Sequence, residues 1–169
     1  MLKKNLFLLL FAVSAVSARA GVDSLIAYVF LAEGCPICQS ITPALNKLHT
    51  VYSNKNLKII GLFPSAISSD SSRQAFADKF KIGFQLMNDR EGHYVQKFGA
   101  SITPEVILLD ASKQNIIYRG LIDDSFAAVG KRRKISKNQY LRNAIEKYLT
   151  TFESSEFTHP IGCKITLAP

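Results

Sequence analysis

The chain has 169 residues, of which 47% are hydrophobic and 20% are charged. This composition excludes a disordered or fibrous chain and fits one globular domain with a real hydrophobic core. The formal net charge is +8. The densest basic run, residues 131–134 with Lys137, lacks interleaved aromatic residues, so we expect no nucleic-acid partner. One interpretation is a patch that docks to an acidic partner or to a membrane surface. The other is a solvated basic loop.

The first twenty residues have the pattern of a secretory signal peptide. Lys3 and Lys4 precede an apolar run at residues 6–16, and Ala18 and Ala20 supply the small residues of a cleavage site. The apolar run is too short for an ordinary membrane span. We therefore expect residues 1–20 to be removed and the rest to be exported across the inner membrane into the periplasm. The alternative is an uncleaved N-terminal anchor.

Two cysteines lie where a predicted strand turns into a predicted helix. Residues 25–31 are continuously apolar, as in a buried central strand, and residues 36–52 have the apolar spacing of a helix. Cys35 and Cys38 fall at the junction. The unpaired N–H groups and positive dipole end of a helix N-terminus stabilise a thiolate there, which lowers a cysteine pKa. The pair is therefore suited to thiol-disulfide exchange.

The remaining segments predict a mixed sheet with helices on both faces. Strands are expected over residues 57–63, 84–87, 106–109 and 116–119, with the last two as an antiparallel hairpin. Helices are expected over residues 75–82, 93–98 and 140–148. This order indicates an α/β domain with a central mixed β-sheet, covering residues 21–152. Residues 153–169 form a C-terminal tail that carries Cys163.

Three features together resemble the thioredoxin superfamily. They are the Cys35-Pro36-Ile37-Cys38 motif, Pro43 inside the following helix, and Thr103-Pro104 directly before the C-terminal hairpin. The resemblance implies a thioredoxin-like fold over about residues 25–149. It also implies that Cys35 is the nucleophile and the more exposed sulfur, and that the more buried Cys38 resolves the mixed disulfide. Thr103 and a cis Pro104 would present a backbone edge to an extended substrate peptide.

Within the superfamily, the chain is most similar to the exported redoxins of the peroxiredoxin-like, AhpC/TSA-type branch, which includes thiol-disulfide exchange proteins. The similar segments are residues 76–80, 88–92, 106–110 and 160–165. True peroxiredoxins carry Thr or Ser three residues before the reactive cysteine, and Pro four residues before that Thr or Ser. This chain has Ala32 and Tyr28 there, which argues against fast reaction with peroxide.

Two further residues allow several interpretations. Glu33 either accepts a proton from Cys38 or is a solvent-facing loop acid. Cys163 is a second resolving thiol, a regulatory bridge to the active site, or a metal ligand. The metal alternative arises because His159 and Cys163, together with Cys35 and Cys38, match a zinc-like spacing. Soft thiolates with histidine also suit Cu(I).

The sequence thus predicts an exported thiol-disulfide oxidoreductase that needs no cofactor and binds no metal. The alternatives are a thiol peroxidase and a zinc or copper carrier that uses the three cysteines. The expected partners are protein thiols or disulfides and a redox partner, with a membrane-bound electron donor as one option. The sequence does not fix the direction of electron flow.

Overall fold

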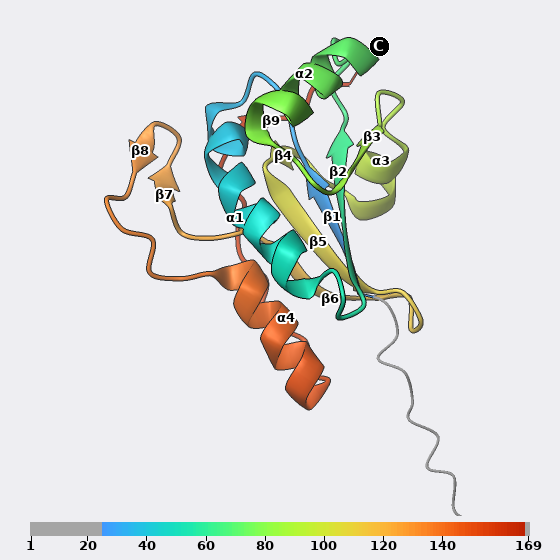
Figure 1. The fold of residues 1–169 in the computed structure, drawn as a ribbon, viewed down its shortest axis with the longest axis vertical. Helices are drawn as coiled ribbons and strands as arrows, with labels where there is room; N and C mark the ends of the chain where they lie inside the picture. The colour runs from blue at the N-terminus through green and yellow to red at the C-terminus, as the bar shows by residue number, and fades with distance from the viewer. Residues whose placement is uncertain (1–24, 168–169) are drawn as a thin grey trace, which may run out of the picture.

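The computed structural model describes residues 25–167, so the predicted signal peptide lies outside the described residues. The chain alternates strands and helices (Figure 1). The elements are β1 (Leu25–Phe30), α1 (Pro36–Tyr52), β2 (Leu57–Phe63), α2 (Asp70–Phe80), β3 (Gln85–Asn88), α3 (His93–Phe98), β4 (Ile102–Thr103), β5 (Glu105–Asp110), β6 (Asn115–Gly120), β7 (Phe126–Ala128), β8 (Lys131–Arg132), α4 (Tyr140–Thr151) and β9 (Cys163–Lys164). Among these, no helix combines the length and apolarity needed to cross a membrane.

Five strands form one mixed sheet in the order β3-β2-β1-β5-β6. The apolar strand β1 lies at its centre, parallel to β2 and antiparallel to β5. The helix α1 connects β1 to β2, as a parallel pair requires a crossover. The antiparallel hairpin of β5 and β6 is also present. The predicted α/β fold with a central mixed sheet is confirmed.

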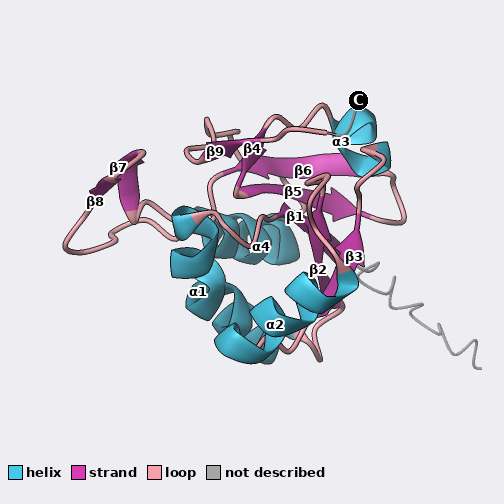
Figure 2. Cartoon of the chain, turned by 90° about the horizontal axis from the view of Figure 1, so that it is seen from above, coloured by secondary structure: helices cyan, strands magenta, loops and turns pink. Residues whose placement is uncertain are grey.

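The two faces of the sheet carry separate hydrophobic clusters because strand side chains alternate. Leu25, Ala27 and Val29 of β1 pack with α1, α2 and α4, whereas Tyr28 and Phe30 pack with α3. Figure 2 shows α1, α2 and α4 beneath the sheet and α3 above it. Cys35 and Cys38 belong to the larger cluster, on the α1 side. The reactive motif is thus built on the most buried part of the domain.

The segment between β6 and α4, predicted only as a polar basic connection, contains a small hairpin. Strands β7 and β8 pair there and project from the body of the domain (Figure 1). The basic residues 131–134 and Lys137 are all exposed. Their exposure fits both a docking patch and a solvated basic loop.

The C-terminal tail folds back across the sheet, and we name its residues 153–167 the C-terminal strap. Ser155 N donates to Ile117 O at 2.9 Å, and Thr158 N donates to Arg119 O at 2.9 Å. The strap therefore lies along the outer side of β6. Further on, β9 pairs antiparallel with β4. Sequence periodicity indicated neither of these two-residue strands, although their pairing brings residue 163 to the reactive motif.

Candidate active site

The helix α1 begins at the reactive motif. Cys35 is its N-cap residue with extended backbone angles, and Pro36 occupies the first turn, where its missing N–H costs nothing. A turn in which Cys35 N donates to Ala32 O at 3.1 Å joins β1 to the helix. Local sequence accounts for this geometry: a buried strand ends, a short turn with Gly34 follows, and proline starts the helix.

The two cysteines of the motif have opposite pKa shifts. The pKa of Cys35 is lowered to about 5, chiefly by a hydrogen bond from the Cys38 thiol and against the opposing effect of burial. The Cys163 thiol and the backbone N–H groups of Cys38 and Ile37 contribute to the same lowering. Burial, and then the Cys35 thiolate, raise the pKa of Cys38 well above its ordinary value. The opposite pKa shifts favour a thiolate at Cys35 and a protonated thiol at Cys38 at neutral pH.

Thr103 and Pro104 lie against the sulfur of Cys35. The Thr103–Pro104 peptide bond is cis, as predicted. The Sγ atom of Cys35 donates to Thr103 O at 3.4 Å when it is protonated. The backbone edge that the sequence predicted beside the sulfurs is present, formed by β4.

Cys163 also reaches the reactive motif. Its Sγ atom lies 2.6 Å from the Sγ atom of Cys35 and donates a hydrogen bond to it. Burial, and then the Cys35 thiolate, raise the pKa of Cys163 to about 11. The three cysteines that the sequence contains therefore meet at one site, with one thiolate and two protonated thiols.

Cys35 is the more exposed of the two sulfurs, as predicted, but both residues are buried, at 2% exposure for Cys35 and 0% for Cys38. The C-terminal strap contributes to the burial of Cys35, because β9 pairs with β4 and places Cys163 against Cys35. A cleft of about 510 Å³ remains open beside the sulfurs. Its lining includes Glu33, Cys35, Ile67, Thr103 and Cys163.

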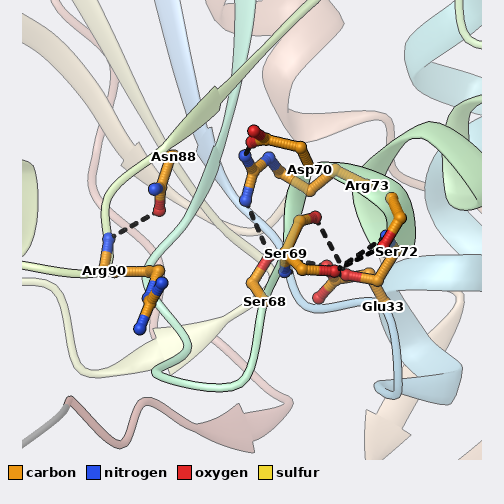
Figure 3. A network of polar contacts seen from close by, with 9 residues as sticks. Glu33, Ser68, Ser69, Asp70, Ser72, Arg73, Asn88 and Arg90 are labelled. Atoms are coloured by element: carbon orange, nitrogen blue, oxygen red, sulfur yellow. Dashed lines mark hydrogen bonds and ion pairs between the residues drawn. The ribbon is translucent and has the colours of Figure 1, made fainter.

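Glu33 is half-buried at the edge of this cleft, and its carboxylate contacts serine side chains. Its Oε1 atom accepts hydrogen bonds from the hydroxyls of Ser68 at 2.6 Å and Ser72 at 2.8 Å. Figure 3 shows the carboxylate directed at this serine cluster, where Ser69 caps α2. Glu33 thus ties the loop before Cys35 to the start of α2, and a proton-transfer role stays a prediction.

The peroxiredoxin positions carry other roles here. Tyr28 lies in the cluster on the α3 side, with its ring centroid 5.2 Å from those of both Tyr94 and Phe98. Ala32 has no hydroxyl to position a peroxide. In residues 25–167, no group of three or more His, Cys, Asp or Glu side chains is arranged to hold a metal ion, and His159 is exposed.

Gly162 is a site residue that the sequence reasoning missed. A Cβ atom there would overlap the carbonyl of Thr103 and would lie 3.0 Å from Pro104 Cδ. The sequence signal was the similarity of residues 160–165 to the redoxin branch, but the importance of Gly162 depends on a pairing between segments about 60 residues apart.

Comparisons with known proteins agree with this fold. A model described as the AhpC/TSA family matches residues 13–122, which include the Cys35–Cys38 pair and Thr103–Pro104 but not the strap. The thioredoxin-like protein YneN of Bacillus subtilis is 33% identical over 63 residues, so the match spans 37% of this chain and 37% of that protein.

Two solved structures show the same fold. An uncharacterized conserved protein from Geobacillus kaustophilus has a TM-score of 0.76 at 21% identity, over 88% of this chain and 80% of that chain. A putative thiol:disulfide interchange protein DsbE from Chlorobium tepidum has a TM-score of 0.55 at 15% identity, over 77% of this chain and 80% of that chain.

Proposed function

The chain belongs to the AhpC/TSA family, and from this we propose that it is a thiol-disulfide oxidoreductase acting on protein disulfides or dithiols through Cys35 and Cys38. The observation that carries the proposal is the opposite shift of two neighbouring pKa values. Cys35, at about 5, is ionised at neutral pH, whereas the pKa of Cys38 is raised by burial. A reactive thiolate beside a protonated reserve thiol is what two-step exchange requires.

The proposed reaction begins when the Cys35 thiolate attacks one sulfur of a substrate disulfide. The substrate S–S bond breaks, its departing thiolate takes a proton from water, and a mixed disulfide forms. Cys38 then loses its proton and attacks Cys35 Sγ, so the second substrate thiol leaves as the Cys35–Cys38 bond forms. The substrate gains two electrons and two protons. An external dithiol donor restores the pair, and the reverse sequence would oxidise a substrate dithiol.

Reduction of insulin by dithiothreitol tests this proposal. We expect Cys35→Ser and Cys38→Ser each to remove the acceleration that the wild-type protein gives. Val129→Ser serves as a control, because Val129 is 65% exposed on the β7–β8 hairpin. Turnover by either cysteine variant at the wild-type rate would contradict the assignment.

Peroxide reduction is a separate activity with its own test. Because Ala32 offers no hydroxyl to a bound peroxide, we expect hydrogen peroxide to oxidise reduced Cys35 no faster than free cysteine at the same thiolate concentration. Stopped-flow measurement on the Cys163→Ser variant, in which Cys35 is not covered by a thiol, gives this rate. A rate several orders of magnitude higher would instead support a thiol peroxidase.

We also propose that the protein works outside the cytoplasm, on the basis of the charged and apolar pattern of residues 1–20. Fractionation of cells that express the full chain, followed by N-terminal sequencing, tests this. A mature N-terminus at Gly21 in the exported fraction is expected, and retention of the full chain in the cytoplasm would contradict it.

A further inference from the structure

The C-terminal strap lies in the groove where the proposed function requires a substrate. Thr103 of β4 pairs antiparallel with Cys163 of β9, and Thr103 Oγ1 donates to Cys163 O at 3.4 Å. Ile165 N donates to Ser101 O at 2.9 Å. An extended peptide joined to Thr103 by backbone pairing is the form expected of a bound substrate. Here a segment of the same chain takes that place.

The strap also brings a sulfur to the position of a reacting substrate sulfur. Cys163 Sγ lies 2.6 Å from Cys35 Sγ, whereas an S–S bond measures about 2.05 Å. A small displacement is therefore sufficient for bond formation. Cys35 is only 2% exposed, and the strap is one of the segments that cover it, because Cys163 contacts its sulfur.

Two glycines fit the strap to the groove. At Gly162, any side chain would overlap the Thr103 carbonyl. At Gly120, whose φ is +131°, a side chain would overlap Thr158. Thr158 is held in turn by Leu121 N, which donates to its Oγ1 at 2.8 Å. The strap is therefore packed closely at both its anchor and its reactive end.

We propose that the C-terminal strap is a built-in substrate, in which Cys163 competes with protein substrates for Cys35. In the oxidised protein, Cys163 loses its proton to water and attacks Cys35 Sγ, the Cys35–Cys38 bond breaks, and Cys38 leaves as a thiolate that takes up a proton from water. The product carries a Cys35–Cys163 bond at the same oxidation level, so no external oxidant is needed. Attack by Cys38 on Cys35 reverses the step. This inference rests on the proposed function of Cys35 as the exchanging nucleophile.

Oxidised glutathione provides a test that does not depend on turnover of a protein substrate. In Cys38→Ser, the Cys35 thiolate captures glutathione as a mixed disulfide, and Cys163 should then displace it. We expect mass spectrometry to find an intramolecular Cys35–Cys163 bond and no retained glutathione. The Cys38→Ser/Cys163→Ser double variant should retain glutathione on Cys35. Equal retention by the single and double variants would overturn the proposal.

Displacing the strap without removing a thiol gives a second test. Gly162→Ala should expel β9 from the groove. Each β9 hydrogen bond that must break before a reagent reaches Cys35 slows the reaction by about two- to tenfold, so we expect alkylation of Cys35 by iodoacetamide to rise at least about tenfold. Val129→Ser is the control, because Val129 is 65% exposed and lies outside the groove, between β7 and β8. An unchanged alkylation rate in Gly162→Ala would contradict an occluding strap.

The two proposals fail in different ways. Wild-type insulin turnover by Cys35→Ser would reject the proposed function. If turnover depends on Cys35 and Cys38, but Cys38→Ser retains glutathione and Gly162→Ala does not change alkylation, only the built-in substrate is rejected.

Discussion

Replacing Cys35 with serine removes the thiol that the site holds as a thiolate, and the stability of the reduced protein should then lose part of its pH dependence. The folded pKa of about 5 lies below the value of about 8.5 expected for an unfolded thiol. A lowered pKa stabilises the folded state fully above the unfolded pKa, and this stabilisation is lost as pH falls through the folded pKa. The relevant window therefore lies between about pH 5 and 8.5.

The size of the effect follows from this window. While folded Cys35 is ionised and the unfolded thiol is still protonated, the free energy of unfolding rises by about 1.4 kcal/mol per pH unit. From pH 5, where folded Cys35 is half ionised, to pH 7, the gain is about 2 kcal/mol. The raised pKa values of Cys38 and Cys163 do not contribute in this interval, because both groups stay protonated in either state.

Urea unfolding in the presence of a phosphine reductant measures this gain. We expect the wild-type protein to gain about 2 kcal/mol relative to Cys35→Ser between pH 5 and pH 7. All other ionisable groups are the same in both proteins, so their contributions cancel in the difference. Absorbance of the thiolate at about 240 nm gives the ionisation directly. A flat stability difference together with a thiolate midpoint near 8.5 would refute the reasoning.

Three further predictions concern residues that support the site, all measured by urea unfolding. Arg119→Met should lower the free energy of unfolding by about 3–5 kcal/mol. The reason is that the buried carboxylate of Glu105, which lies 2.6 Å from Arg119 Nε, loses its cation. A loss below about 1 kcal/mol would contradict this. Asp124→Ala should destabilise the protein at pH 7. Hydrogen bonds, of which that from the Asn138 N–H has the largest effect, lower the pKa of Asp124 to about 2, so the difference in unfolding free energy from the wild-type protein should shrink as pH falls toward 2. A difference that does not change with pH would contradict this. Ser69→Ala should cost about 1 kcal/mol through loss of the α2 cap, whereas Ser71→Ala should stay within about 0.5 kcal/mol; equal losses would show that the cap is not the cause.

The sequence predicted the parts of the fold that local patterns determine. The apolar run of β1, the proline at the start of α1 and the helical spacing up to Tyr52 placed Cys35 at a strand-to-helix junction, where the structure has it. These signals depend on neighbours within a few residues. The lowered pKa of Cys35 was also expected from this junction.

The parts that were missed depend on contacts between distant segments. Strand β9 has two residues, too few to show a period, and its partner β4 lies about 60 residues earlier. The contact between Cys163 and Cys35 follows from that pairing and has no local signature. Glu33 was likewise considered in relation to Cys38 nearby, whereas its contacts are Ser68 and Ser72, on the far side of β2 in the sequence.

The hydrogen bonds that Ser155 and Thr158 make to β6 limit how far the tail can come away. β6 is an outer strand of the sheet, and a bare outer strand invites pairing with another molecule. If β9 leaves the sulfurs while these two hydrogen bonds stay in place, the backbone must bend within residues 159–161. Removing the chain after residue 160 should therefore leave the oligomeric state of the full chain unchanged, whereas removing it after residue 152 should increase self-association, as measured by size-exclusion chromatography.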